Sequence, residues 1–107
     1  MMSDETLYIA LIDANSELER KGKTTPYTSL NGHMTSFLSK ENTMGLRLST
    51  DDREEFIARY NSKLMEQHGR VMKEFVEVSI DVLKDTTTIT NYMNRSVDYT
   101  KTLKPKK

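Results

Sequence analysis

The segment from residue 24 to residue 49 constrains the fold most, because strand and turn signals follow one another closely in it. Asn31-Gly32 accepts positive φ at low cost and predicts a tight turn between strands at 27–30 and 33–39. Between residues 43 and 49, methionine and leucine alternate with polar or small residues, which is typical of a half-buried strand. The segment therefore predicts three strands in an antiparallel meander.

Helical patterns lie on both sides of these strands. Apolar residues recur at helical spacing from Ser3 to Lys21, with carboxylates at the start and Gly22 after the end. Thr50 opens a second helix, which we expect to end near Asn61 or at Gly69. The remaining elements expected are a strand at 71–78, a short helical turn at 79–83 after Ser79, and a last helix at 86–103 capped by Asp85.

The order of elements predicts an α+β fold. It reads α-β-β-β-α-β-α, a four-stranded, mainly antiparallel sheet with helices packed on it in two layers. A length of 107 residues gives room for one domain, which we place at 1–103, and we expect a disordered lysine-rich tail at 104–107. A sheet this small keeps exposed edges, which are compatible with homodimerisation by edge pairing or helix packing.

Composition excludes several classes of protein. Sixteen Lys and Arg balance sixteen Asp and Glu, and this zero net charge favours folding although only 36% of residues are hydrophobic. Cysteine is absent, which excludes disulfides, a thiolate nucleophile and cysteine-based metal sites. No apolar run approaches a membrane span, and the acidic start at 1–5 lacks the basic stretch of a signal peptide. We therefore expect a cytoplasmic protein without membrane association.

From about Asn31 to Thr102 the chain resembles the TfoX N-terminal domain family. Short motifs in a fixed order carry the resemblance: Gly32-His33-Met34, Phe37-Leu38, Gly45-Leu46-Arg47-Leu48, Arg53-Glu54-Glu55-Phe56, Val71-Met72-Lys73-Glu74-Phe75-Val76-Glu77-Val78 and Val82-Leu83-Lys84-Asp85. The chain departs from the family at 24–28, where a Met-Phe-Gly-Gly type segment is usual, and at Ser79, where the family has a proline. The resemblance implies a small non-enzymatic α/β domain with regulatory associations. The chain is also similar to domains of the MmcQ/YjbR type, which are associated with DNA binding.

Catalytic and metal-binding signatures are weak in this sequence. His33 and His68 are the only imidazoles, and neither has a ligand partner at helical spacing, so we predict no metal site. The acidic run 51–55 is compatible with a divalent ion or acid/base chemistry, but complementing the dipole of a helix start is the favoured interpretation. No serine-nucleophile motif occurs, and we predict no catalytic residue. A site assembled only in three dimensions, with a histidine beside carboxylates in a pocket, is the alternative.

The sequence contains weak signals for a cofactor and for nucleic-acid binding. The four glycines are scattered and form no nucleotide-binding loop, so we predict no cofactor. Two groups of basic residues could bind phosphates, with the release of counterions. These candidate nucleic-acid-binding residues are Arg20, Lys21, Lys23, Lys101, Lys104, Lys106 and Lys107.

The sequence thus favours a regulatory or protein-interaction domain that is not an enzyme. We expect a protein partner whose identity the sequence does not provide. Weak nucleic-acid binding through the basic residues is the second hypothesis, and a near-neutral composition disfavours it.

Overall fold

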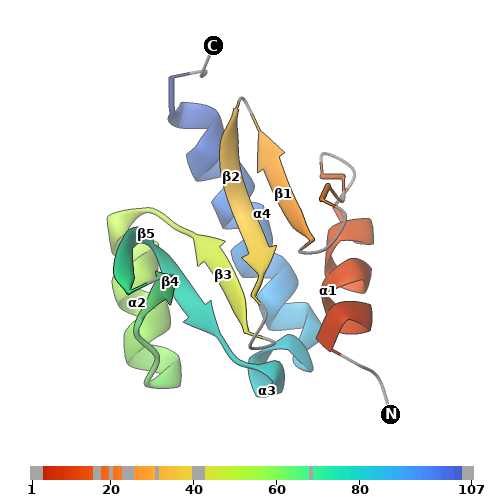
Figure 1. The fold of residues 1–107 in the computed structure, drawn as a ribbon. Coiled ribbons are helices and arrows are strands. Elements are labelled where there is room, and N and C mark those ends of the chain that lie inside the picture. The colour runs from red at the N-terminus through yellow and green to blue at the C-terminus, as the bar shows by residue number, and fades with distance from the viewer. Residues whose placement is uncertain are drawn as a thin grey trace.

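The computed structural model describes residues 4–15, 18–19, 21–22, 26–30, 32–39, 43–67 and 69–104. It contains four helices and five strands within these residues (Figure 1). The elements are α1 (Asp4–Asp13), β1 (Tyr27–Leu30), β2 (His33–Leu38), β3 (Met44–Arg47), α2 (Thr50–Tyr60), β4 (Leu64–Gln67), β5 (Arg70–Val78), α3 (Ile80–Leu83) and α4 (Thr86–Thr102). The predicted α+β class is confirmed.

All five strands join one antiparallel sheet in the order β1-β2-β3-β5-β4. The β1–β2 pair contains an irregularity, because Thr28 pairs with Ser36 while Ser29 pairs with Met34. Thr35 is therefore an extra residue in β2, as in a β-bulge. The bulge lets Met34 and Phe37 share one face although they are three residues apart.

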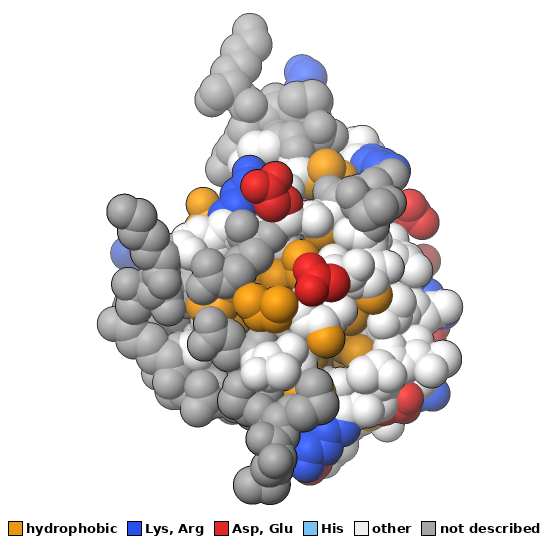
Figure 2. Space-filling view, turned by 90° about the vertical axis from the view of Figure 1, so that its right-hand side faces the viewer, with side chains coloured by type: hydrophobic (Ala, Val, Ile, Leu, Met, Phe, Trp, Pro, Cys, Tyr) orange, Lys and Arg blue, Asp and Glu red, His pale blue; other side chains and the backbone are white. Residues whose placement is uncertain are grey.

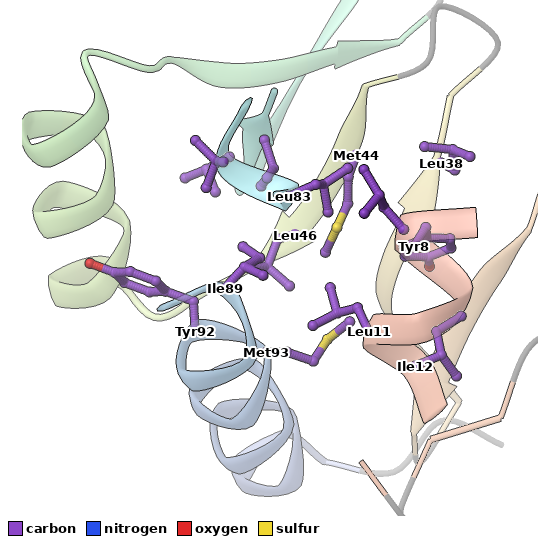
Figure 3. Packing of buried hydrophobic residues seen from close by; sticks show 14 of the residues in the cluster. Tyr8, Leu11, Ile12, Leu38, Met44, Leu46, Leu83, Ile89, Tyr92 and Met93 are labelled. Carbon is purple, nitrogen blue, oxygen red and sulfur yellow. The ribbon is translucent and has the colours of Figure 1, made fainter. Parts of the chain in front are cut away.

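The helices cover one face of the sheet, and α2 and α4 lie behind it in Figure 1. All four described helices contribute to the main core, whereas a second cluster contains strand residues only. Figure 3 shows Tyr8 and Leu11 of α1 and Met93 of α4 pointing toward Met44 and Leu46 of β3. The second cluster consists of buried Phe37, Met65 and Phe75 with half-buried Tyr27, Met34 and Met72. The sheet face of this second cluster thus has no described helix on it.

The predicted four-stranded sheet is wrong in its strand count, because β4 adds a fifth strand. The sequence-based expectation allowed the second helix to reach Gly69. In the structure α2 ends at Asn61, which takes a left-handed conformation (φ 50°, ψ 44°) and donates its N–H to Ile57. Gly69, with φ of 76°, lies instead in the two-residue turn between β4 and β5.

The first helix is shorter than predicted and ends at Asp13 instead of Lys21. Asp13 and Asn15 lie at this end of the helix, and such side chains compete with the helical backbone for hydrogen bonds. The Asn15 side chain instead donates to Asn94 Oδ1 of α4 at 2.7 Å. Leu18 lies beyond the helix and is still buried in the main core.

Candidate functional site

The predicted nucleic-acid-binding residues are placed only in part. Lys21, Lys101 and Lys104 are exposed, while Arg20, Lys23, Lys106 and Lys107 lie outside the described residues. The Lys21 backbone pairs with Tyr27 at the end of β1 far from the hairpin turn. Lys104 follows α4 and lies beside His33, just after that turn. The backbones of the two basic groups therefore lie at opposite ends of the β1–β2 hairpin.

His33 is the one histidine within the described residues, and it does not line the cleft between α2 and α4. His33 Nε2–H donates to the backbone carbonyl of Lys104 at 2.6 Å, so its ring holds the chain after α4. His68 lies outside the described residues, as do residues 105–107 of the tail predicted at 104–107. Among the residues that the structure describes, no group of three His, Asp or Glu side chains is placed to hold a metal ion.

The acidic run at the start of α2 takes part in an ion network with α4. Ser49 caps the helix, since its Oγ accepts from the Asp52 N–H at 3.3 Å. Arg95 Nη1 of α4 lies 3.0 Å from Glu55 Oε1 and 3.4 Å from Asp52 Oδ1. Tyr92 also donates its hydroxyl to Glu55 Oε1 at 2.8 Å. The acidic run therefore contacts side chains of α4, in addition to its expected interaction with the dipole of α2.

The ionisation of this network follows from these hydrogen bonds. The bond from Tyr92, followed by that from Arg95, lowers the pKa of Glu55. Burial, followed by the bond to Glu55, raises the pKa of Tyr92. Glu55 is thus held as a carboxylate and Tyr92 as a neutral phenol at neutral pH.

A second network links the end of β3 to α4 through Glu74 of β5. Arg47 forms an ion pair with Glu74 and donates from Nε to the Met34 carbonyl at 2.7 Å. Its guanidinium lies 4.7 Å from the Phe75 ring centroid. Tyr99 donates to Glu74 Oε2 at 2.6 Å, and this bond together with burial raises the pKa of Tyr99.

A shallow cleft of about 420 Å³ lies between the start of α2 and the second half of α4. Its lining residues are Ser49, Asp52, Arg95, Asp98, Tyr99 and Thr102. Arg95 contacts two carboxylates, and the Tyr99 hydroxyl donates a hydrogen bond to Glu74. Among the lining residues, Asp52, Arg95 and Tyr99 are held by these contacts, none of which pairs a nucleophile with a base.

The two edges of the sheet differ in how their outward backbone groups are used. On β1, the Tyr27 N–H donates to Lys21 (3.0 Å) and the Tyr27 carbonyl accepts from Lys21 (2.8 Å). The Lys21 ammonium also donates to Ser29 Oγ at 3.2 Å. A lysine along an edge strand hinders pairing with another chain.

β4 lies at the other edge of the sheet, and no described strand pairs with its outer side. The Lys63 carbonyl accepts from the Glu77 N–H at 2.9 Å, so the backbone of residue 63 points toward β5. Backbone direction alternates along a strand, so the N–H and C=O groups of Leu64 point outward.

Exposed side chains accompany this edge. Val71, the Cα partner of Glu66, is 52% exposed and is the one large hydrophobic side chain described as exposed. Lys63 has a side chain that is 66% exposed and only a 3.8 Å contact to Glu77. Arg70 and Lys73 are also exposed. The β4–β5 hairpin therefore combines an edge strand, one exposed apolar side chain and three exposed cations.

The opposite side of the molecule, where α1 and β1 lie, has a different character. Figure 2 shows hydrophobic side chains at the centre of this view with acidic side chains beside them. The accessible residues of α1 include half-buried Ile9 and exposed Ala10 and Asp13, and exposed Ala14 follows the helix. This part of α1 presents small apolar and acidic side chains, and exposed Lys21 lies at the neighbouring edge of β1.

Sequence reasoning missed the hairpin edge as a functional candidate. The available signals were Asn61, which can end a helix in the left-handed conformation, and Gly69 between two short apolar segments. Together, Asn61 and Gly69 predict a helix end followed by a hairpin turn. Gly69 alone is also compatible with the end of a longer helix.

Comparisons of the chain with protein-family models, curated proteins and solved structures found no match. Within the described residues, no helix has the length and apolar character needed to cross a membrane.

Proposed function

We propose that this chain is a non-catalytic protein-interaction module that recognises a protein partner through the β4–β5 hairpin. The observation that carries the proposal is the difference between the two sheet edges. Lys21 pairs with the outer edge of β1, whereas β4, at the other end of the strand order, directs the N–H and C=O of Leu64 outward and has no described strand on that side. Such an edge is a template for an added strand.

The state of the carboxylates supports a non-catalytic role. Glu55 and Glu74 each accept from a tyrosine and an arginine, which holds them in place. A general acid at neutral pH needs a raised carboxyl pKa, and that of Glu55 is lowered. These interactions hold α2, α4 and the sheet together, which is a structural role.

The resemblance to the TfoX N-terminal domain family agrees with this proposal, because it implies a regulatory domain without a catalytic residue. A cytoplasmic location and homodimerisation are further parts of the proposal. Nucleic-acid binding through Lys21, Lys101 and Lys104 is less favoured, because the first is remote from the other two along the hairpin.

Site-specific photo-cross-linking in native cells tests the proposal. A photoreactive residue at Val71 should give discrete protein adducts, while the same residue at exposed Thr87 of α4 is the matched control. Adducts at Val71 alone support the module, and an adduct of doubled chain mass identifies a second copy as the partner. Equal adducts at both positions, or adducts at neither, contradict it, and cross-linking to nucleic acid favours the second hypothesis.

A further inference from the structure

We infer that the sheet face of the second cluster, called the second face below, binds an acidic amphipathic helix of a partner protein. No described helix of the chain itself covers this face. The inference rests on the proposed function, because it takes the chain to be an interaction module, and it adds a contact surface beside the β4–β5 hairpin. It follows from the apolar centre of the second face, the direction of the sheet backbone and the positions of the charges.

The centre of the second face is apolar and rich in methionine. Phe37 of β2 and Phe75 of β5 lie on either side of β3, with ring centroids 5.7 Å apart. The Phe37 ring lies over Gly45 of β3, which has no side chain on this face. Half-buried Met34 and Met72 pack against the two rings. Methionine side chains are flexible and adapt to the shape of a bound apolar surface.

Strand irregularities bring both methionines to this face. Met34 and Phe37 are three residues apart and share the second face because of the bulge at Thr35. Met72 and Phe75 are also three residues apart, in a part of β5 where its pairing with β4 is irregular. Strict alternation would direct one member of each pair to the helix-covered face. Bulges commonly re-aim side chains at functional sites.

The direction of the sheet backbone favours a helix as the bound segment. The N–H and C=O groups of a sheet point toward neighbouring strands, and only side chains project from its faces. A segment that lies over the second face must therefore satisfy its own backbone groups. A helix does so internally and presents an apolar stripe. Helix α4 packs in this way on the other face, with Ile89, Met93 and Val97 in the main core.

Cations lie on both sides of the apolar centre. On the β1 side, the neighbours of Ser29 in the strand face the main core, so Ser29 Oγ lies on the second face. It accepts from the Lys21 ammonium at 3.2 Å. On the β4 side, Lys63 has a side chain that is 66% exposed and lies 3.8 Å from Glu77.

The spacing of these lysines fits a helix that lies along β3. In the strand order, β1 and β4 each lie two strands from β3, which is roughly 10 Å. A helix with side chains is about 10–12 Å wide, so carboxylates on both flanks of its apolar stripe can reach Lys21 and Lys63. Arg47, at the centre, is already paired with Glu74. A second copy packed face to face would bring the same lysines together, whereas an acidic helix offers complementary charge.

Two synthetic peptides provide the probe for this inference. The first is acetyl-Glu-Leu-Glu-Ala-Leu-Leu-Ala-Glu-Leu-Glu-Ala-Leu-Leu-Gln-amide, whose leucines form one helical stripe with glutamates on both flanks. The second has lysine in place of every glutamate. Each is titrated into the full chain, which carries ¹³C in its methionine methyl groups.

The methionines supply both the reporters and the internal controls. Met34 and Met72 report on the second face, whereas Met44 and Met93 are fully buried in the main core. We expect the acidic peptide to shift the signals of Met34 and Met72 and to leave those of Met44 and Met93 unchanged. The lysine peptide should bind at least about tenfold more weakly.

Matched variants test the charge and the apolar contact separately. Lys63→Glu should weaken the acidic peptide about fivefold and reduce the salt dependence of its binding. Lys84→Glu is the control, because Lys84 is exposed and follows α3, which packs in the main core. Met34→Gln keeps the side-chain length but removes its apolar end, and should weaken binding at least about threefold. The amide spectrum of each variant shows whether it is folded, and Lys63→Glu carries the test if Met34→Gln is not.

Several results would overturn the inference. They are equal binding of the two peptides, equal effects of Lys63→Glu and Lys84→Glu, and shifts of Met44 and Met93 as large as those of Met34 and Met72. Signals of Met34 and Met72 that change on dilution of the free protein would show that a second copy occupies the second face instead. If neither peptide binds while Val71 still cross-links a protein, this inference fails and the proposed function stands.

Discussion

Replacing Gly45 with alanine tests how the second cluster is packed. Gly45 of β3 lies beneath the Phe37 ring, and a Cβ added to it would approach Phe37 Cζ to 2.6 Å, well inside van der Waals contact. Phe37 is 5% exposed, and its ring centroid lies 5.7 Å from that of Phe75. Because the ring is enclosed, it can move away only by displacing its neighbours.

The expected cost of Gly45→Ala follows from two opposed effects. Overpacking a buried cluster costs roughly 1–3 kcal/mol, whereas replacing a glycine inside a strand stabilises it by roughly 0.5–1 kcal/mol. We therefore expect a net loss of about 1–2 kcal/mol in the free energy of unfolding. Urea unfolding followed by circular dichroism should show a lower midpoint with an unchanged slope.

A double-mutant cycle identifies the cause of this loss. Phe37→Leu shortens the side chain above Gly45 and by itself destabilises the cluster by leaving a void. Gly45→Ala should cost at least about 1 kcal/mol less in the Phe37→Leu background than in the native chain. The reasoning is refuted if Gly45→Ala stabilises the protein, or if the two changes are additive.

Three further changes test other parts of the fold. Ser36→Ala removes the buried hydrogen bonds of the Ser36 hydroxyl, including that to Tyr8 at 2.7 Å. It should lower the free energy of unfolding by about 2 kcal/mol. An unchanged free energy of unfolding in a urea titration would contradict this. The folded-state pKa of Glu55 is lowered, so its stabilising contribution is present above the unfolded value of about 4.5 and is lost as pH falls through the folded value. Glu55→Gln should therefore show a smaller fall in thermal midpoint between neutral and acidic pH than the native chain, and parallel curves would contradict this. Asn61→Val should lower the free energy of unfolding by about 1–2 kcal/mol, because Asn61 is left-handed at the end of α2, while Asn61→Gly should change it little. Equal urea midpoints for the two variants would contradict the assigned helix cap.

Local signals made much of the fold predictable from sequence. Asn31-Gly32 set the β1–β2 hairpin, and the alternation through β3 placed Met44, Leu46 and Leu48 in the core, where all three are fully buried. Asp85 caps α4 as predicted, with its carboxylate accepting from the Thr88 N–H at 3.5 Å. These features depend on neighbours within a few residues, which is why the sequence alone reveals them.

The features that were missed depend on distant residues or on competing local signals. Asn61 and Gly69 are each compatible with a helix end, so the short strand β4 between them was not recognised. The contact of Arg95 with Asp52 and Glu55 joins helices about forty residues apart, which no local pattern encodes. The outward direction of the Leu64 backbone requires the register of β4 on β5, which only the structure provides.

Amide hydrogen exchange in the free protein tests the central claim, the difference between the two sheet edges. Tyr27 on β1 also points outward, but its N–H is bonded to Lys21, and Glu77 on β5 is bonded to Lys63. The account predicts slow exchange at Tyr27 and Glu77 and fast exchange at Leu64. Protection of Leu64 comparable to that of Tyr27 would show that the β4 edge is already covered, which contradicts the account.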